Sequence, residues 1–106
     1  MIEIKDETEK VILVGVALSD QDDTKESLEE LKDLVSTAGA ETAGMLIQNR
    51  EQQHPATYVG KGKIEELKNM IWELRATGIV CDDELSPAQM KNLQDELDVK
   101  VMDRTL

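Results

Sequence analysis

The chain has 106 residues, so we expect residues 1–106 to form one domain with one modest hydrophobic core. Its formal net charge of −11 excludes a protein whose whole surface wraps nucleic acid, and its two aromatic residues are too few for the stacking platforms of single-strand binders. The longest apolar run, residues 11–18, is too short to cross a bilayer, so we expect no membrane span.

The first half of the chain predicts a strand, a helix and a second strand. Residues 11–18 form a continuous apolar run, which is typical of a strand covered on both faces. A helix follows, with Asp23 and Glu26 placed to cap its start and Gly39 to end it as a left-handed cap. Its apolar residues recur at helical spacing: Leu28, Leu31, Leu34, Val35 and Ala38. Residues 43–47 predict the second strand.

The second half repeats this alternation after a polar loop over residues 48–57. The next helix follows Gly60-Lys-Gly62 and is predicted to end at Gly78, with one apolar stripe made by Ile64, Leu67, Ile71 and Leu74. Residues 79–81 predict a third strand. A capping box, Ser86-Pro-Ala-Gln89, then starts a helix whose inward face carries Met90, Leu93 and Leu97, and residues 99–102 predict a fourth strand.

Strands that alternate with helices across short connections predict a parallel sheet with right-handed crossovers. The fold class is therefore α/β, a small doubly wound layer with a four-stranded parallel sheet and three helices. The chain stops at Asp103-Arg-Thr-Leu106, just as a further apolar segment begins, which suggests that it is cut from a longer protein.

The segment from Tyr58 to Lys63 is the first candidate binding site. Gly60 and Gly62 would let the backbone approach an anion, the helix start would present free N–H groups, and Lys61 and Lys63 would add positive charge. Residues 42–81 hold 4 acids and 5 bases, so a face that meets an anion comes from this third of the chain. The segment matches neither a P-loop nor a dinucleotide fingerprint, and a flexible turn with solvated lysines is an equal alternative.

The run Asp82-Asp-Glu84 follows a predicted strand, at the edge where open α/β sheets bind ligands. It would suit a magnesium ion or a ribose hydroxyl, but acids are also common before a helix start, and we favour a solvated turn with no metal. We assign no catalytic residue. His54 is expected to be exposed, Cys81 to be a small core residue, and Trp72 to lie at the rim of the core or outside it.

Several segments together resemble the N-terminal domain of the HflX family of ribosome-associated GTPases. The resemblance covers nearly the whole chain from Val11. The matching stretches are Ser27-Leu-Glu-Glu-Leu31, Thr37-Ala-Gly-Ala40, Pro55-Ala-Thr-Tyr-Val-Gly-Lys-Gly-Lys63 through Ile64-Glu-Glu-Leu67, Asp82-Asp-Glu-Leu-Ser-Pro87 with Gln89 and Asn92-Leu93, and Val101-Met-Asp-Arg-Thr105.

The resemblance implies a parent protein in which a helical hairpin and a GTP-binding domain follow this domain. Such a parent binds the large ribosomal subunit and its RNA, splits or rescues stalled ribosomes, and holds GTP and magnesium in its GTPase domain. This chain has no P-loop and no Asn-Lys-x-Asp motif, so we expect no GTP hydrolysis from it alone. The resemblance also implies nucleotide binding, ATP included, by Gly60, Lys61, Gly62 and Lys63 with Tyr58 as a stacking neighbour, and it assigns no role to Asp82, Asp83, Glu84, Ser86 and Pro87.

Three functions are therefore compatible with the sequence. The preferred one is a noncatalytic accessory domain of a ribosome-binding GTPase, whose Gly-Lys-Gly-Lys segment meets RNA phosphates or a neighbouring domain. The alternative is an independent module that binds ATP or another nucleotide through the same segment. The third is a scaffold that orients the following hairpin through packing. The N-terminus lacks the features of a signal peptide and the single cysteine has no partner within the chain, so we expect a cytoplasmic protein.

Overall fold

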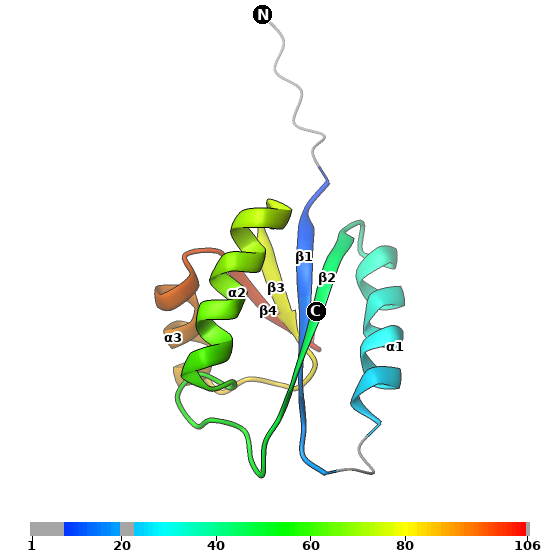
Figure 1. Cartoon of the computed structure of the whole chain (residues 1–106). Helices are drawn as coiled ribbons and strands as arrows, with labels where there is room; N and C mark the ends of the chain where they lie inside the picture. The colour runs from blue at the N-terminus through cyan, green and yellow to red at the C-terminus, as the bar shows by residue number, and fades with distance from the viewer. Residues whose placement is uncertain (1–7, 20–22, 106) are drawn as a thin grey trace, which may run out of the picture.

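The computed structural model describes residues 8–19 and 23–105. Strands and helices alternate along this part of the chain (Figure 1). The strands are β1 (Lys10–Ala17), β2 (Glu41–Asn49), β3 (Gly78–Cys81) and β4 (Lys100–Asp103), and the helices are α1 (Thr24–Thr37), α2 (Lys61–Leu74) and α3 (Pro87–Leu97). None of these helices is long and apolar enough to span a bilayer.

The four strands form one parallel sheet in the order β2-β1-β3-β4. Helix α1 covers one face of the sheet, and α2 and α3 cover the other (Figure 1). The predicted fold class, a doubly wound α/β layer with four parallel strands and three helices, is confirmed. The chain moves from β1 outward to β2 and then crosses back to β3, so the strand order reverses between β1 and β3.

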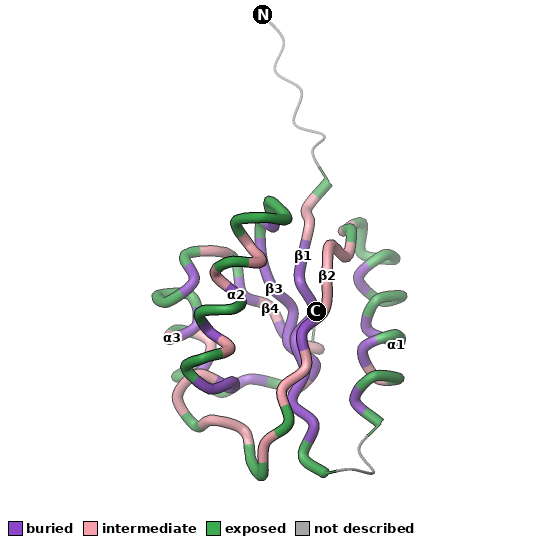
Figure 2. The backbone as a smooth tube through the Cα atoms, viewed as in Figure 1, coloured by how far each residue is buried: buried purple, intermediate pink, exposed green. Residues whose placement is uncertain are grey.

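The sheet separates two hydrophobic clusters, and β1 contributes to both (Figure 2). Val11 and Leu13 face α1, where they pack with Leu28, Leu31 and Val35. The alternate side chains of β1 face α2 and α3, in the larger cluster that includes Ile64, Leu67, Leu93 and Leu97. Because both faces of β1 are covered, the strand is apolar at successive positions instead of alternating with polar residues.

Helix α1 begins at a position that the sequence predicts correctly, but the expected side-chain cap is wrong. Asp23 occupies the N-cap position and makes no side-chain cap hydrogen bond. Its backbone has φ −98° and ψ 35°, outside the extended region in which an N-cap side chain reaches the next free N–H groups. The other end follows the prediction, since Gly39 has φ +95° and its N–H donates to the Ser36 carbonyl.

The predicted end of α2 at Gly78 is also wrong. The helix ends at Leu74, and Arg75 supplies the left-handed residue with φ 57°. Gly78 instead starts β3, where a Cβ atom would lie 2.8 Å from the Lys100 carbonyl oxygen of the neighbouring strand. The glycine therefore permits close packing of two strands, and it does not cap the helix.

The start of α3 confirms the predicted capping box. The Ser86 hydroxyl accepts a hydrogen bond from the Gln89 N–H at 3.1 Å, and the Gln89 side chain accepts one from the Ser86 N–H at 3.0 Å. Pro87 occupies the first turn, where its missing N–H leaves no helical hydrogen bond unmade.

Candidate functional site

The candidate residues gather at the carboxyl end of the sheet, because parallel strands all end at the same edge (Figure 1). Three segments meet there: the loop over residues 50–60 after β2, the loop over residues 82–86 after β3, and residues 103–105 at the end of β4. In open α/β sheets this edge is the usual place for a ligand, especially where the strand order reverses. A ligand at this edge would need groups in these segments that the fold does not already use.

Tyr58 is buried in the larger cluster, with 0% of its surface exposed. Its hydroxyl donates a hydrogen bond of 2.5 Å to Oδ2 of Asp83. Burial and the Asp83 carboxylate raise the pKa of Tyr58, so the hydroxyl stays protonated and remains a donor. No face of the ring is open to a nucleotide base in this structure, so its burial gives no support to Tyr58 as a stacking neighbour, and that role stays a prediction.

Tyr58 also fixes the backbone of its loop. It adopts φ 68°, a left-handed conformation that is costly for a bulky residue. A pair of backbone hydrogen bonds between His54 and Tyr58 closes the loop, at 3.1 Å and 2.8 Å. The buried ring and the bond to Asp83 hold this strained residue in place.

His54 is half-buried and organises the same loop, so the expectation that it is simply exposed is wrong. Its Nδ1 atom accepts hydrogen bonds from the N–H groups of Ala56 and Thr57, at 3.1 Å and 3.3 Å. Helix α3 holds the loop from the other side, because the amides of Gln89 and Asn92 donate to the carbonyl oxygens of His54 and Ala56. The loop is thereby fixed between the sheet and α3.

Arg104 closes the point at which the strand order reverses. Its guanidinium donates to Oδ1 of Asp82 at 2.8 Å and 3.1 Å, and to the Asp82 carbonyl oxygen. It also donates to the hydroxyl and the carbonyl oxygen of Ser27 on α1. Asp82 is only 8% exposed, and its charge is neutralised by this ion pair. Asp82 is therefore not free to bind a metal ion or a ribose hydroxyl.

Asp103 ties the end of β4 to the loop after β3. One carboxylate oxygen accepts from the Leu85 N–H at 2.8 Å, and the other accepts from the N–H and hydroxyl of Thr105. Burial raises the pKa of the Asp103 carboxyl, but the hydrogen bonds from Thr105 and Leu85 outweigh it and the net shift is downward.

The acidic run after β3 is thus largely used by the fold itself. Asp82 pairs with Arg104, Asp83 accepts from Tyr58, Ser86 and Pro87 begin α3, and Glu84 is exposed. In the part of the chain that the structure describes, no three metal-binding side chains converge on one point. The solvated-turn interpretation of this run is too simple, because two of its three acids have intramolecular partners.

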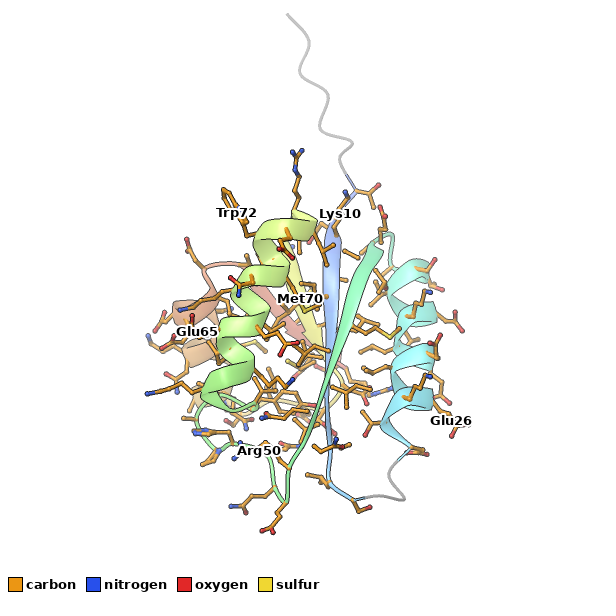
Figure 3. The ribbon with its side chains drawn as sticks, viewed as in Figure 1. Lys10, Glu26, Arg50, Glu65, Met70 and Trp72 are labelled. Atoms are coloured by element: carbon orange, nitrogen blue, oxygen red, sulfur yellow. The ribbon has the colours of Figure 1, made fainter. Side chains whose placement is uncertain are left out.

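At the start of α2, the fold already uses the backbone N–H of Gly60. Its N–H donates to the Gln48 side chain at 2.8 Å, and a Cβ atom would lie 2.8 Å from the guanidinium of Arg50, which is labelled in Figure 3. Gly62 has open space around it. Lys61 is exposed, whereas Lys63 forms an ion pair with Glu66 at 2.9 Å. Of the two lysines, Lys61 is the one whose side chain is available to an anion.

A hollow of about 360 Å³ lies beside Lys61. It is lined by His54, Thr57, Lys61, Ile64, Glu65 and Glu96. The carboxylates of Glu65 and Glu96 oppose the charge of a bound phosphate and offset that of the single lysine. The geometry therefore offers a weak anion-binding position at the start of α2 and no enclosed nucleotide pocket there.

Sequence reasoning missed the residues that connect these segments, chiefly Arg104, Asp103 and Asn92. Their signal lay in the family resemblance, which includes Asp103-Arg-Thr105 and Asn92 together with the two longer motifs. The structure brings these motifs into contact with one another through hydrogen bonds. Most of the resemblance therefore describes one network at the carboxyl end of the sheet.

The fold and this network define the chain as a small doubly wound α/β domain whose motif residues largely satisfy each other. A family model described as "GTP-binding GTPase N-terminal" matches residues 25–106. "GTPase HflX" of Lacrimispora saccharolytica is 63% identical over 106 residues, which are 100% of this chain and 25% of that protein. "GTPase HflX" of Escherichia coli is 35% identical over 105 residues, or 99% of this chain and 24% of that protein.

The chain therefore belongs to the family of GTP-binding GTPase N-terminal domains, as its resemblance to HflX proteins indicated. It spans about a quarter of the length of these curated relatives. A crystal structure of a mutation variant of SsGBP superposes with a TM-score of 0.68 at 21% identity, covering 93% of this chain and 30% of that one. At this level of identity the superposition supports the fold alone.

Proposed function

We propose that the chain is the noncatalytic accessory domain of an HflX-type GTPase that binds the large ribosomal subunit. The observation that carries the proposal is the match along the whole chain to the first quarter of GTPases named HflX. GTP hydrolysis and its magnesium ion then belong to the part of such a protein outside this chain. The resemblance supplies the expectation that the parent splits or rescues stalled ribosomes.

Within that parent, the start of α2 is the position best suited to contact ribosomal RNA. Lys61 is exposed, the neighbouring helix N–H groups carry partial positive charge, and no acidic residue lies in the first turn of α2. The middle third of the chain is also nearly neutral, whereas residues 1–41 hold 12 acids and 4 bases and would be repelled by RNA. We expect Lys61 to contribute one contact with an RNA phosphate to the binding affinity.

The test uses a chimera in which this chain replaces the matching first quarter of the Lacrimispora saccharolytica GTPase HflX, to which it is 63% identical. Lys61→Glu should weaken cosedimentation of the chimera with large ribosomal subunits. It should also reduce the slope of log affinity against log salt concentration by about 1, as expected when one phosphate contact is lost. Lys63→Glu should have a smaller effect, because Lys63 already pairs with Glu66.

Lys91→Glu is the matched control. Lys91 is an exposed lysine in the middle of α3 and pairs with Asp95, so its reversal changes the net charge by the same amount at another surface. If Lys61→Glu and Lys91→Glu weaken binding equally, the effect is one of overall charge and the contact at α2 is wrong. If the unsubstituted chimera does not cosediment at any salt concentration, the ribosomal role itself is wrong.

The competing proposal, an independent module that binds ATP or another nucleotide, has weaker support. Tyr58 is buried, Asp82 and Asp83 have intramolecular partners, and Glu65 and Glu96 line the hollow beside Lys61. A nucleotide would have to bind through the α2 start against these two carboxylates. Direct titration of the chain with nucleotide separates the two proposals.

A further inference from the structure

The opposite end of the sheet carries a surface that the proposed function does not use. At the C-terminal end of α2, Trp72 is 83% exposed and its side chain points away from the sheet (Figure 3). A hollow of about 580 Å³ lies beside it. We call this the Trp72 surface, and it is lined by Ile71, Trp72, Glu73, Arg75 and Ala76.

The residue types at the Trp72 surface are those found at the centre of protein–protein interfaces. Tryptophan and arginine are the residue types most enriched among side chains that dominate binding energy. The other exposed large apolar side chains in the described part of the chain, Leu18, Leu34 and Leu74, are at most 47% exposed. The backbone N–H of Arg75 donates to the Ile71 carbonyl oxygen, whereas its side chain forms no hydrogen bond or ion pair with a residue that the structure describes, so the guanidinium is available to a partner.

A second copy of the chain, RNA or a neighbouring part of the same polypeptide could cover this surface, and the charges of the chain favour the last of these. Two copies of a chain with a net charge of −11 repel each other, and Glu73 within the surface opposes an RNA phosphate. A neighbouring part of the same polypeptide does not have to associate from solution, because its covalent connection gives it a high effective concentration at this surface. The HflX relatives extend for about three times the length of this chain beyond the matched region.

We propose that the Trp72 surface is the docking site for the part of an HflX-type GTPase that follows this domain in the polypeptide. The proposal rests on the proposed function only in taking the chain to be the first domain of such a GTPase. The described chain reaches residues 103–105 at the carboxyl end of the sheet, whereas Trp72 lies at the other end of α2. To reach Trp72 from the carboxyl end of the sheet, the docked segment must extend along the 14 residues of α2, a distance of about 21 Å. A folded region about three times as long as this chain spans that distance easily.

Oxidative footprinting read by mass spectrometry tests this docking, because it reports the exposure of one named side chain. The two samples are the 106-residue chain and the chimera described above. Trp72 should be oxidised about fivefold more slowly in the chimera, as expected for a side chain at the centre of an interface. Leu34 on α1, which is 47% exposed, is the matched control and should react equally in both samples.

A second variant identifies the docked segment. Trp72→Ala in the chimera should increase the oxidation of one region beyond residue 106, and Leu34→Ala should not. Trp72 is exposed, so its replacement does not threaten the folding of the domain.

Three results would overturn the proposal. The first is equal oxidation of Trp72 in the chain and the chimera. The second is protection of Trp72 in the 106-residue chain that grows with its concentration, which would identify a second copy as the occupant. The third is protection in the chimera that appears only when large ribosomal subunits are added. Because none of these measurements depends on Lys61 or on cosedimentation, failure of the docking proposal is distinct from failure of the ribosomal role.

Discussion

The two ends of the parallel sheet differ in how completely their polar and apolar groups are satisfied from within the domain. At the carboxyl end, Arg104, Asp82, Asp83 and Tyr58 are joined by hydrogen bonds across segments far apart in sequence. At the amino end, Trp72 is exposed beside a hollow. Apart from Lys61 and the hollow beside it, the polar side chains at the motif-rich end are largely paired within the domain, whereas the motif-poor end carries the exposed Trp72.

This difference shows that a distinctive sequence pattern can arise from ligand binding or from contacts within the fold. The motifs at the carboxyl end resemble ligand-binding loops, yet most of their side chains hold neighbouring loops together. The most exposed large apolar side chain in the described chain stands in an ordinary helical stretch with no motif around it. Substitutions at the two ends of the sheet should therefore differ in their effect on the stability of the domain.

Arg104→Ala should produce the largest loss of stability among the variants at the carboxyl end of the sheet. It leaves the nearly buried Asp82 carboxylate without its cation and removes the hydrogen bonds to Ser27. Since the Arg104 side chain is about a third exposed, we expect the free energy of unfolding to fall by about 2 to 3 kcal/mol. Urea denaturation measures the change, and Lys91→Ala, which breaks an exposed pair, should leave the midpoint unchanged. Equal effects of the two variants would contradict a closed carboxyl end.

Tyr58→Phe should cost less, because the ring and its packing are retained and only the hydrogen bond to Asp83 is lost. We expect the free energy of unfolding to fall by about 1.5 kcal/mol. Asp83→Asn keeps an oxygen that accepts from the hydroxyl, so its cost should be smaller. The same urea titration compares the two variants, and a gain in stability in Tyr58→Phe would show that the bond is not needed.

Asp103 should make the stability depend on pH in the acid range. Its pKa is lowered in the folded state, so the unfolded state binds the proton more tightly. The stabilisation is therefore complete above the ordinary carboxyl pKa of about 4 and is lost as the pH falls through the lowered value.

Asp103→Asn should lower the free energy of unfolding at neutral pH and flatten the decline in stability as the pH falls below about 4. Denaturation midpoints across that range provide the measurement. A decline as steep in Asp103→Asn as in the unsubstituted chain would assign the pH dependence to other groups.

Trp72→Ala should have the smallest effect on the stability of this chain. The side chain is mostly exposed, so its removal should change the free energy of unfolding by no more than about 0.5 kcal/mol. The matched control on the same helix is Leu67→Ala, which empties a fully buried site and should cost about 3 kcal/mol. A loss above about 1 kcal/mol in Trp72→Ala, measured by thermal or urea denaturation, would mean that the residue supports the fold of the domain itself.

The sequence predicts the elements well because their signals are local. The continuous apolar run of β1, the leucine spacing of α1 and the Ser86–Gln89 capping box each depend on neighbouring residues, and all three are found. Gly78 shows where local reasoning fails, since a glycine that follows a helical pattern suggests a cap. The reason for this glycine is Lys100 on a neighbouring strand, which sequence spacing cannot indicate.

The candidate site depends even more on contacts between distant positions. Tyr58 and Asp83 are 25 residues apart, and Arg104 and Ser27 are 77 apart. Composition and spacing can place an acid after a strand, but they cannot tell whether an arginine from another strand end neutralises it. The exposure of Trp72 was easier to predict, because helical geometry alone places it away from the apolar stripe.

The central claim, that the motif residues at the carboxyl end serve the fold and leave no nucleotide pocket, is tested most directly by an NMR shift titration. The 106-residue chain is titrated with magnesium-ATP and, separately, with magnesium-GTP, and the amides of residues 58–65 and 82–87 are followed. The account predicts no saturable shift in either segment at millimolar nucleotide. Saturable shifts confined to these two segments would contradict it and make the domain a nucleotide-binding module.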